Sequence, residues 1–109
     1  LEKLGFEILD PWVLEGKEFD IKPEKVFERD ISLLKSARIV VAEVSTPSLG
    51  VGMELMLAKI LGGRVILCYR KGARVSRMVL GAGFERIEYE NEKDLEKKLF
   101  DLLQNFTSF

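Results

Sequence analysis

The sequence predicts an α/β protein, a three-layer doubly wound parallel sheet with helices on both faces, of the Rossmann or flavodoxin type. Strand-like and helix-like segments alternate along the chain, which favours parallel pairing through helical crossovers. Two of the strand-like segments, 38–44 and 64–69, are mostly runs of β-branched and other apolar residues. Such runs are typical of parallel strands that are buried on both faces. The chain has 109 residues, 47% of them hydrophobic, so we expect one domain over residues 1–109.

The first half of the chain is expected to supply two strands and two helices. In order these are a strand at 6–9, a loop at 10–22, a helix at 22–37, a strand at 38–44, a loop at 45–50 and a helix at 51–61. Pro23 suits the first turn of its helix, and Gly62 and Gly63 end the second helix. The apolar positions of the first helix recur at spacings of three and four and are expected to point inward: Val26, Phe27, Leu33, Leu34 and Ala37.

The second half continues the same alternation. In order we expect a strand at 64–69, a turn at 71–72, a short helix at 75–80, a strand at 84–89 and a closing helix at 92–106. Polar and apolar residues alternate in the strand at 84–89, which indicates a place at or near a sheet edge. Residues 1–5 read as the last turn of a helix with a glycine stop, so we expect a further element upstream of Leu1.

Composition excludes several classes of function. The net charge is −1 and the basic residues are scattered among acidic ones, which gives no footprint for nucleic acid or for a membrane surface. The chain has no histidine, so a histidine metal site and a Ser-His triad are both excluded within it. Cys68 is the single cysteine, which excludes an internal disulfide and favours a reducing compartment, so we expect a cytoplasmic protein.

Glu54 is unusual because it lies among apolar residues near the start of a helix. The loop before that helix follows a buried strand, and parallel sheets bind ligands at the carboxyl ends of their strands. We place Glu54 at most four residues into the helix, where the helix dipole stabilises a carboxylate. A partly buried carboxylate held in this way suits a nucleophile or an ion-pair acceptor. The alternative is a glutamate that is simply favoured in a first helical turn.

Asp30 repeats this pattern on the preceding helix. Its helical neighbours are all apolar, and aspartate is a poor residue for the middle of a helix. It is either a buried structural acid or a second carboxylate that faces the same cleft as Glu54. Two carboxylates in one cleft suit the cleavage of a glycosidic bond, one attacking the anomeric carbon and the other managing protons.

The loop before Glu54 has features of an anion site. Gly50 and Gly52 allow a ligand to approach the backbone just before a helix, and Ser48 can donate a hydroxyl. The spacing is neither a P-loop nor a dinucleotide-binding fingerprint. Glu43, a charge at the end of a buried strand, is expected to pair with a lysine or to lie at a subunit contact, and a catalytic role is the alternative.

The stretch RDISLLKSARIVVAEVSTPSLGVGMELMLAK resembles the nucleoside 2-deoxyribosyltransferase superfamily. Its nearest branch is that of the 2'-deoxynucleoside 5'-phosphate N-hydrolases. The shared pattern is Asp30 in a helix, a V-V-A-E-V strand and P-S-L-G-V-G-x-E-L, with no gap between Asp30 and Glu54. The similarity continues through RVILCYRKGARVSRM to the end of the chain.

The resemblance implies a role for each matching residue. Glu54 would be the nucleophile that forms a deoxyribosyl-enzyme intermediate, and Asp30 would assist the departing base. The 5'-phosphate would be held by Ser48, Gly50 and Gly52. In a homodimer, the neighbouring subunit's phosphate would be reached by Ser76, Arg77 and Met78. Trp12 lies near a position that contacts the base, as a lid over a flat ring, although it can equally be a core residue. No metal and no organic cofactor is implied.

Ser48 favours nucleotides over nucleosides as substrates. Transferases of the superfamily carry an aspartate six residues before the nucleophile, where this sequence has Ser48. A carboxylate there would repel a phosphate, whereas a hydroxyl accepts one. We therefore expect hydrolysis of 2'-deoxynucleoside 5'-monophosphates.

Two alternatives remain, a deoxyribosyltransferase and a non-catalytic nucleotide-binding module. The second rests on departures from the family pattern, with Met53 in place of a tyrosine and Met56-Leu57 in place of Gly-Arg. The family's first strand and phosphate-binding loop also do not occur within these 109 residues.

Overall fold

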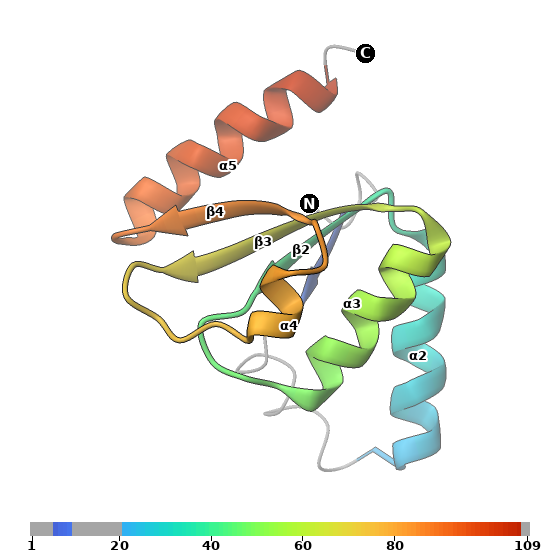
Figure 1. The fold of residues 1–109 in the computed structure, drawn as a ribbon. Helices are drawn as coiled ribbons and strands as arrows, with labels where there is room; N and C mark the ends of the chain where they lie inside the picture. The colour runs from blue at the N-terminus through green and yellow to red at the C-terminus, as the bar shows by residue number, and fades with distance from the viewer. Residues whose placement is uncertain (1–5, 10–20, 108–109) are drawn as a thin grey trace.

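A four-stranded parallel sheet forms the centre of the protein (Figure 1). The computed structural model describes residues 6–9 and 21–107, so the predicted loop with Trp12 lies outside the described residues. The strands are β1 (Phe6–Leu9), β2 (Ile39–Glu43), β3 (Arg64–Arg70) and β4 (Glu85–Tyr89), and they pair in the order β1-β2-β3-β4. All three pairings are parallel, as the alternation of strands and helices predicts.

Helices cover both faces of this sheet and complete the three predicted layers. The helices α2 (Pro23–Ser36), α3 (Leu49–Leu61) and α4 (Arg77–Leu80) connect consecutive strands and lie on one face, and α5 (Glu92–Thr107) lies on the other (Figure 1). The core is therefore divided in two by the sheet, with one cluster facing α3 and another facing α5.

The two inner strands are buried on both faces. In β2, Val40 and Ala42 face α3, whereas Ile39 and Val41 belong to the cluster under α5. This division explains the continuous apolar run in the sequence, because neither face of these strands meets water. Strand β4 lies at an edge, where it buries only alternate residues, as its pattern predicts.

Helix α3 begins two residues earlier than the sequence indicates. Ser48 is its N-cap, with extended backbone and a side chain that accepts a hydrogen bond from the Val51 N–H at 3.3 Å. The Gly52 N–H bonds the Ser48 carbonyl at 3.1 Å, so the helical ladder already includes both glycines. Gly50 and Gly52 therefore lie in the first turns of α3 rather than in the loop before it. Glu54 is consequently the sixth residue of the helix and lies in its second turn.

Helix α2 buries less of its apolar stripe than its periodicity predicts. Leu34 is its only buried residue, and Ala37 at its C-cap packs against the same cluster. Phe27 and Leu33 were expected to point inward but are 57% and 41% exposed. The helix thus contacts the core mainly through its carboxyl-terminal end, and these two side chains remain exposed.

Candidate active site

The loop after β2 delivers the start of α3 to the carboxyl edge of the sheet, where a ligand site is expected. The strand ladder extends one residue beyond β2, because the Val44 N–H donates to the Cys68 carbonyl at 2.9 Å. Four residues later Ser48 caps α3. Its hydroxyl oxygen accepts the bond that caps the helix, which leaves the hydroxyl hydrogen to donate to a ligand.

Glu54 is the only charged side chain among the described residues that is buried, at 8% exposure. Helical side chains lean toward the amino terminus of their helix, so the carboxylate extends back over the preceding turn. Its Oε1 atom lies 4.0 Å from the point where a Cβ atom at position 50 would be. A glycine at position 50 therefore places no side chain beside this carboxylate oxygen. In the second turn the helix dipole stabilises the carboxylate less than predicted. Because the side chain extends toward the amino terminus of the helix, however, the charged group lies closer to the helix start than its Cα atom does.

Asp30 lies on α2, a helix that packs directly against α3. Its side chain is 14% exposed, and its Oδ1 accepts from the Arg29 Nε at 3.0 Å. The adjacent guanidinium supplies the positive charge that a nearly buried carboxylate needs. This environment is compatible with a structural acid and with an acid that faces a ligand, so both interpretations of Asp30 remain.

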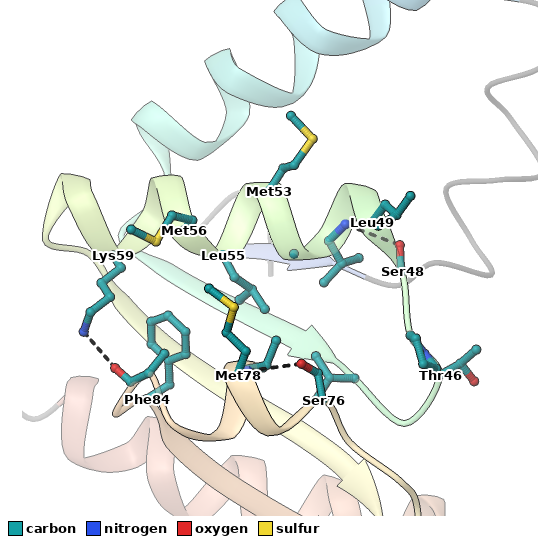
Figure 2. Close-up of a pocket in the computed structure, with 16 residues that line it drawn as sticks. Thr46, Ser48, Leu49, Met53, Leu55, Met56, Lys59, Ser76, Met78 and Phe84 are labelled. Atoms are coloured by element: carbon teal, nitrogen blue, oxygen red, sulfur yellow. Dashed lines mark hydrogen bonds between the residues drawn. The ribbon is translucent and has the colours of Figure 1, made fainter.

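A cavity of about 610 Å³ lies between α3 and α4 (Figure 2). It brings together residues of the two predicted phosphate-binding segments, Ser48 and Gly52 from α3 with Ser76 and Met78 from α4. Ser76 caps α4 as Ser48 caps α3, since its hydroxyl accepts from the Val79 N–H at 3.3 Å. One end of the cavity thus holds two serine hydroxyls.

The opposite end of the cavity is closed by Lys59 (Figure 2). Its Nζ donates to the Ala82 carbonyl at 2.8 Å and lies 5.5 Å from the centre of the Phe84 ring. Most of the remaining lining is apolar and was not predicted as part of a site; it includes Leu49, Met53, Met56 and Phe84. The 4-3 spacing of Leu49, Met53 and Met56 along one helix side is the signal that could have identified them.

The predicted residues thus fall into two groups. Ser48, Gly52, Ser76 and Met78 line the cavity, whereas Glu54, Asp30, Gly50 and Arg77 are not among its lining residues. Position 50 is close to the Glu54 carboxylate, while a Cβ built at Gly52 has nothing within 4 Å outside the adjacent helix backbone. Helix α3 therefore presents Gly50 and Gly52 to different surroundings, although the sequence suggested one shared role.

Glu43 lies at the strand end, as predicted, and within residues 21–107 its partners are a backbone N–H and a phenol, not the lysine that was one of the two expected partners. Its carboxylate accepts hydrogen bonds from the Ser45 N–H at 2.5 Å and from the Tyr89 hydroxyl. Cys68 lies in the core beside it at 2% exposure, and burial, with the Glu43 charge, raises the pKa of the thiol to about 12. A thiol with that pKa stays protonated near neutral pH, so Cys68 is a core residue and not a nucleophile.

None of the helices in residues 21–107 is both long and apolar enough to span a lipid bilayer.

Comparison with known proteins identifies relatives of this chain, although no family model matches it. A protein of Thermofilum pendens is 38% identical over 104 residues, covering 91% of this chain and 73% of the relative. Its name, 2'-deoxynucleoside 5'-phosphate N-hydrolase 1, is a provisional assignment. The 5-hydroxymethyl-dUMP N-hydrolase of Mus musculus is 40% identical over 84 residues, which are 72% of this chain and 49% of the mouse protein.

The fold is also shared with a solved structure. A CMP N-glycosidase from Clostridium botulinum superimposes with a TM-score of 0.65 at 23% identity, over 71% of this chain and 73% of that one. This likeness concerns the fold. The sequence identity with the archaeal relative, which extends over nearly the whole of this chain, shows that the chain belongs to the 2'-deoxynucleoside 5'-phosphate N-hydrolase family.

Proposed function

We propose that this chain is part of an enzyme that hydrolyses the N-glycosidic bond of 2'-deoxynucleoside 5'-monophosphates to the free base and deoxyribose 5-phosphate. The observation that carries the proposal is the buried Glu54 carboxylate, which lies against Gly50 in a helix that Ser48 begins. The names of the relatives from Thermofilum pendens and mouse support the same chemistry.

In the first step, a Glu54 carboxylate oxygen bonds to the anomeric carbon of the sugar. The bond from that carbon to the base breaks through an oxocarbenium-like transition state, and its electron pair stays on the base nitrogen. Asp30 assists protonation of the departing base. Water then attacks the same carbon, the bond to Glu54 breaks, and a carboxylate accepts the proton of the water. Glu54 is thereby regenerated, and no metal or cofactor takes part.

The 5'-phosphate is placed at the start of α3 in this proposal. The amino terminus of α3 presents backbone N–H groups without helical partners, and glycine at positions 50 and 52 keeps side chains away from it. The Val51 and Gly52 N–H groups already bond the Ser48 hydroxyl and carbonyl, so the groups left for the phosphate are those of Leu49 and Gly50. The Ser48 hydroxyl adds a donor without adding a negative charge. This is the feature that favours a nucleotide over a nucleoside and water over a second base as the acceptor.

We further infer a homodimer in which two copies contact each other through α3. Four residues spaced 4-3-4 along α3, Leu49, Met53, Met56 and Ile60, are between 55% and 91% exposed and form the α3 stripe. This spacing is that of a helix–helix seam. Met78 of α4 is 85% exposed and lines the cavity beside the stripe, so a second copy would cover both. Met53→Glu should convert the full-length dimer to monomer in light scattering, and a monomeric wild type would contradict the inference.

Turnover by the full-length protein tests the proposed activity. Each of the four deoxynucleoside monophosphates is incubated with and without an added free base, and the products are separated by chromatography. Free base and deoxyribose 5-phosphate are expected, and both should disappear in Glu54→Gln but persist in the exposed control Glu96→Gln. A new nucleotide or nucleoside containing the added base would identify a transferase. Binding without turnover would refute the catalytic role of Glu54.

A cytoplasmic location remains a prediction from the single cysteine.

A further inference from the structure

A hydrogen-bond network joins the carboxyl ends of three strands beside the candidate site. The Glu43 network consists of Glu43, Ser45 and Tyr89. Glu43 ends β2, and its carboxylate accepts from the Ser45 backbone N–H at 2.5 Å and from the Tyr89 hydroxyl at the end of β4. The Ser45 hydroxyl in turn accepts from the Arg70 N–H of β3 at 2.8 Å. Ser45 is therefore fixed by two hydrogen bonds, one from its backbone N–H to Glu43 and one to its hydroxyl from the Arg70 N–H.

Ser45 is three residues from Ser48, and few soft dihedral angles separate them. Pro47 fixes its own φ angle, and the residue before a proline is restricted to extended conformations, which limits Thr46. The position of Ser45 thus largely determines where Ser48 and the start of α3 lie. Glu43 and Tyr89 are 46 residues apart in sequence and belong to the strands on either side of β3.

We propose that the Glu43 network positions the loop at 45–48, so that Ser48 and the first turn of α3 are held in place to receive the phosphate of the substrate. This inference rests on the proposed function for its substrate. In this proposal Glu43, Ser45 and Tyr89 are positioning residues, which act through Ser48 rather than by binding the nucleotide themselves.

The chemistry of the network suits a fixed support near neutral pH. Burial raises the pKa of the Tyr89 phenol, and its hydrogen bond to Glu43 raises it further, so the phenol keeps the proton that it donates. The Arg70 guanidinium lies 5.8 Å from the centre of the Tyr89 ring, and its charge lowers the phenol pKa by less than burial and Glu43 raise it. A carboxylate acceptor also makes stronger hydrogen bonds than a neutral one.

Tyr89→Phe in the full-length protein tests the proposal, because it removes one hydroxyl and leaves the ring in the core. The matched control is Tyr69→Phe on the neighbouring strand, whose ring packs in the opposite core cluster. We expect Tyr89→Phe to raise KM for the nucleotide about tenfold, on the reasoning that the free energy of the lost Tyr89–Glu43 hydrogen bond is what holds the loop in place for the phosphate. We expect kcat and the KM for the matching deoxynucleoside to stay within about twofold, because neither depends on the phosphate site.

Glu43 variants provide a rescue series. Glu43→Ala removes both acceptors and should raise the nucleotide KM further than Tyr89→Phe. Glu43→Gln keeps an amide oxygen that can accept from Ser45, so part of the affinity should return. A purely structural role would lower the melting temperature without separating nucleotide from nucleoside.

Amide hydrogen exchange over residues 44–52 gives a readout that does not need turnover. We expect faster exchange there in Tyr89→Phe and Glu43→Ala, and wild-type exchange in Tyr69→Phe. Unchanged exchange in both Glu43-network variants would overturn the proposal, as would equal losses for nucleotide and nucleoside. If the wild-type protein cleaves no nucleotide, the proposed function fails, while the exchange data still decide whether the network holds the loop.

Discussion

Gly50→Ala is expected to stabilise the protein and to inactivate it. Gly50 is exposed and lies within α3, and a Cβ built there has Glu54 Oε1 at 4.0 Å as its nearest neighbour, an ordinary van der Waals distance. The protein can therefore accept the methyl group without strain. Alanine in place of glycine at an exposed helical position contributes about 0.5–1 kcal/mol, so the free energy of unfolding should rise by that amount.

The same methyl group lies beside the carboxylate that we propose as the nucleophile. If the sugar approaches Glu54 across position 50, the methyl occupies part of its path. Overpacking of this kind costs about 1–3 kcal/mol, which corresponds to a roughly five- to 150-fold loss in kcat/KM. Gly52→Ala is the comparison that affects the proposed phosphate site but not Glu54, because outside the adjacent helix backbone no atom lies within 4 Å of its Cβ position.

Urea unfolding followed by circular dichroism measures the first effect, and steady-state release of the free base measures the second. Both alanine variants should gain stability, and Gly50→Ala should lose more of its activity. Wild-type kcat/KM in Gly50→Ala would refute the reasoning, because it would show that substrate does not pass over Gly50. A loss of stability would show that the backbone at position 50 is not helical in solution.

Four further predictions concern the cap, the core and the phosphate site. Ser48→Asp keeps an N-cap acceptor and should preserve the free energy of unfolding. Its negative charge should lower kcat/KM for nucleotides at least about tenfold relative to nucleosides. Equal effects on both substrates would show that the phosphate does not bind at this position. Gly62→Ala should cost about 1 kcal/mol in urea unfolding, because Gly62 caps α3 with a φ of 77°, whereas Gly63→Ala, whose φ is not positive, should cost less. Leu67→Ala, at a fully buried site, should cost about 2–5 kcal/mol, and a smaller cost would show that the core collapses around it. Burial raises the pKa of the Cys68 thiol from 9.0 to about 12, so the thiol keeps its proton in the folded protein at pH values where the unfolded chain has lost it. The free energy of unfolding should therefore fall between pH 9 and 12, by at most about 4 kcal/mol. Cys68→Ala should flatten that part of the pH profile.

The sequence predicts the sheet well because its inner strands leave a strong one-dimensional signal. Residues 39–43 and 65–68 include continuous buried runs in which both faces of the strand are apolar, and the β-branched residues within these runs favour a strand. The edge position of β4 follows equally from its alternation. Local patterns of this kind need no knowledge of which segments meet in space.

The start of α3 was misplaced because glycine is a poor helix former in isolation. Gly50 and Gly52 indicate a loop by propensity, yet the Ser48 cap and the bond from Gly52 to the Ser48 carbonyl extend the helix over them. The exposure of Phe27 was missed for another reason. Periodicity shows that residues share a helix face, but it does not show what that face packs against.

The hydrogen-bond partners of Glu43 could not be predicted from the local sequence pattern either. Its hydrogen bond to Tyr89 joins residues that only the order β2-β3-β4 brings together. From sequence, a carboxylate at the end of a strand is expected to pair with a cation. In the structure, Glu43 instead accepts hydrogen bonds from a backbone N–H and a phenol. Long-range polar contacts of this type depend on topology, which residue types alone do not specify.

Helix α3 packs on the core with one face and carries the proposed dimer surface on the other. Its amino terminus is therefore the part of the site that we expect to be most sensitive to substitutions. Its inner face packs on the sheet through Val51, Leu55 and Ala58, and its outer face carries the α3 stripe. Glu54 lies in the second turn of the helix, where the packing of Val51, Leu55 and Ala58 in the core holds its position. The first turn, which begins with Ser48, depends in addition on the loop at 45–48, and that loop is held by the ends of β3 and β4. A change at Tyr89 should therefore affect the proposed phosphate site without touching substrate, whereas Leu49, Met53 and Met56 of the α3 stripe line the same cavity as Ser48, so a change there can act directly as well as through the proposed dimer.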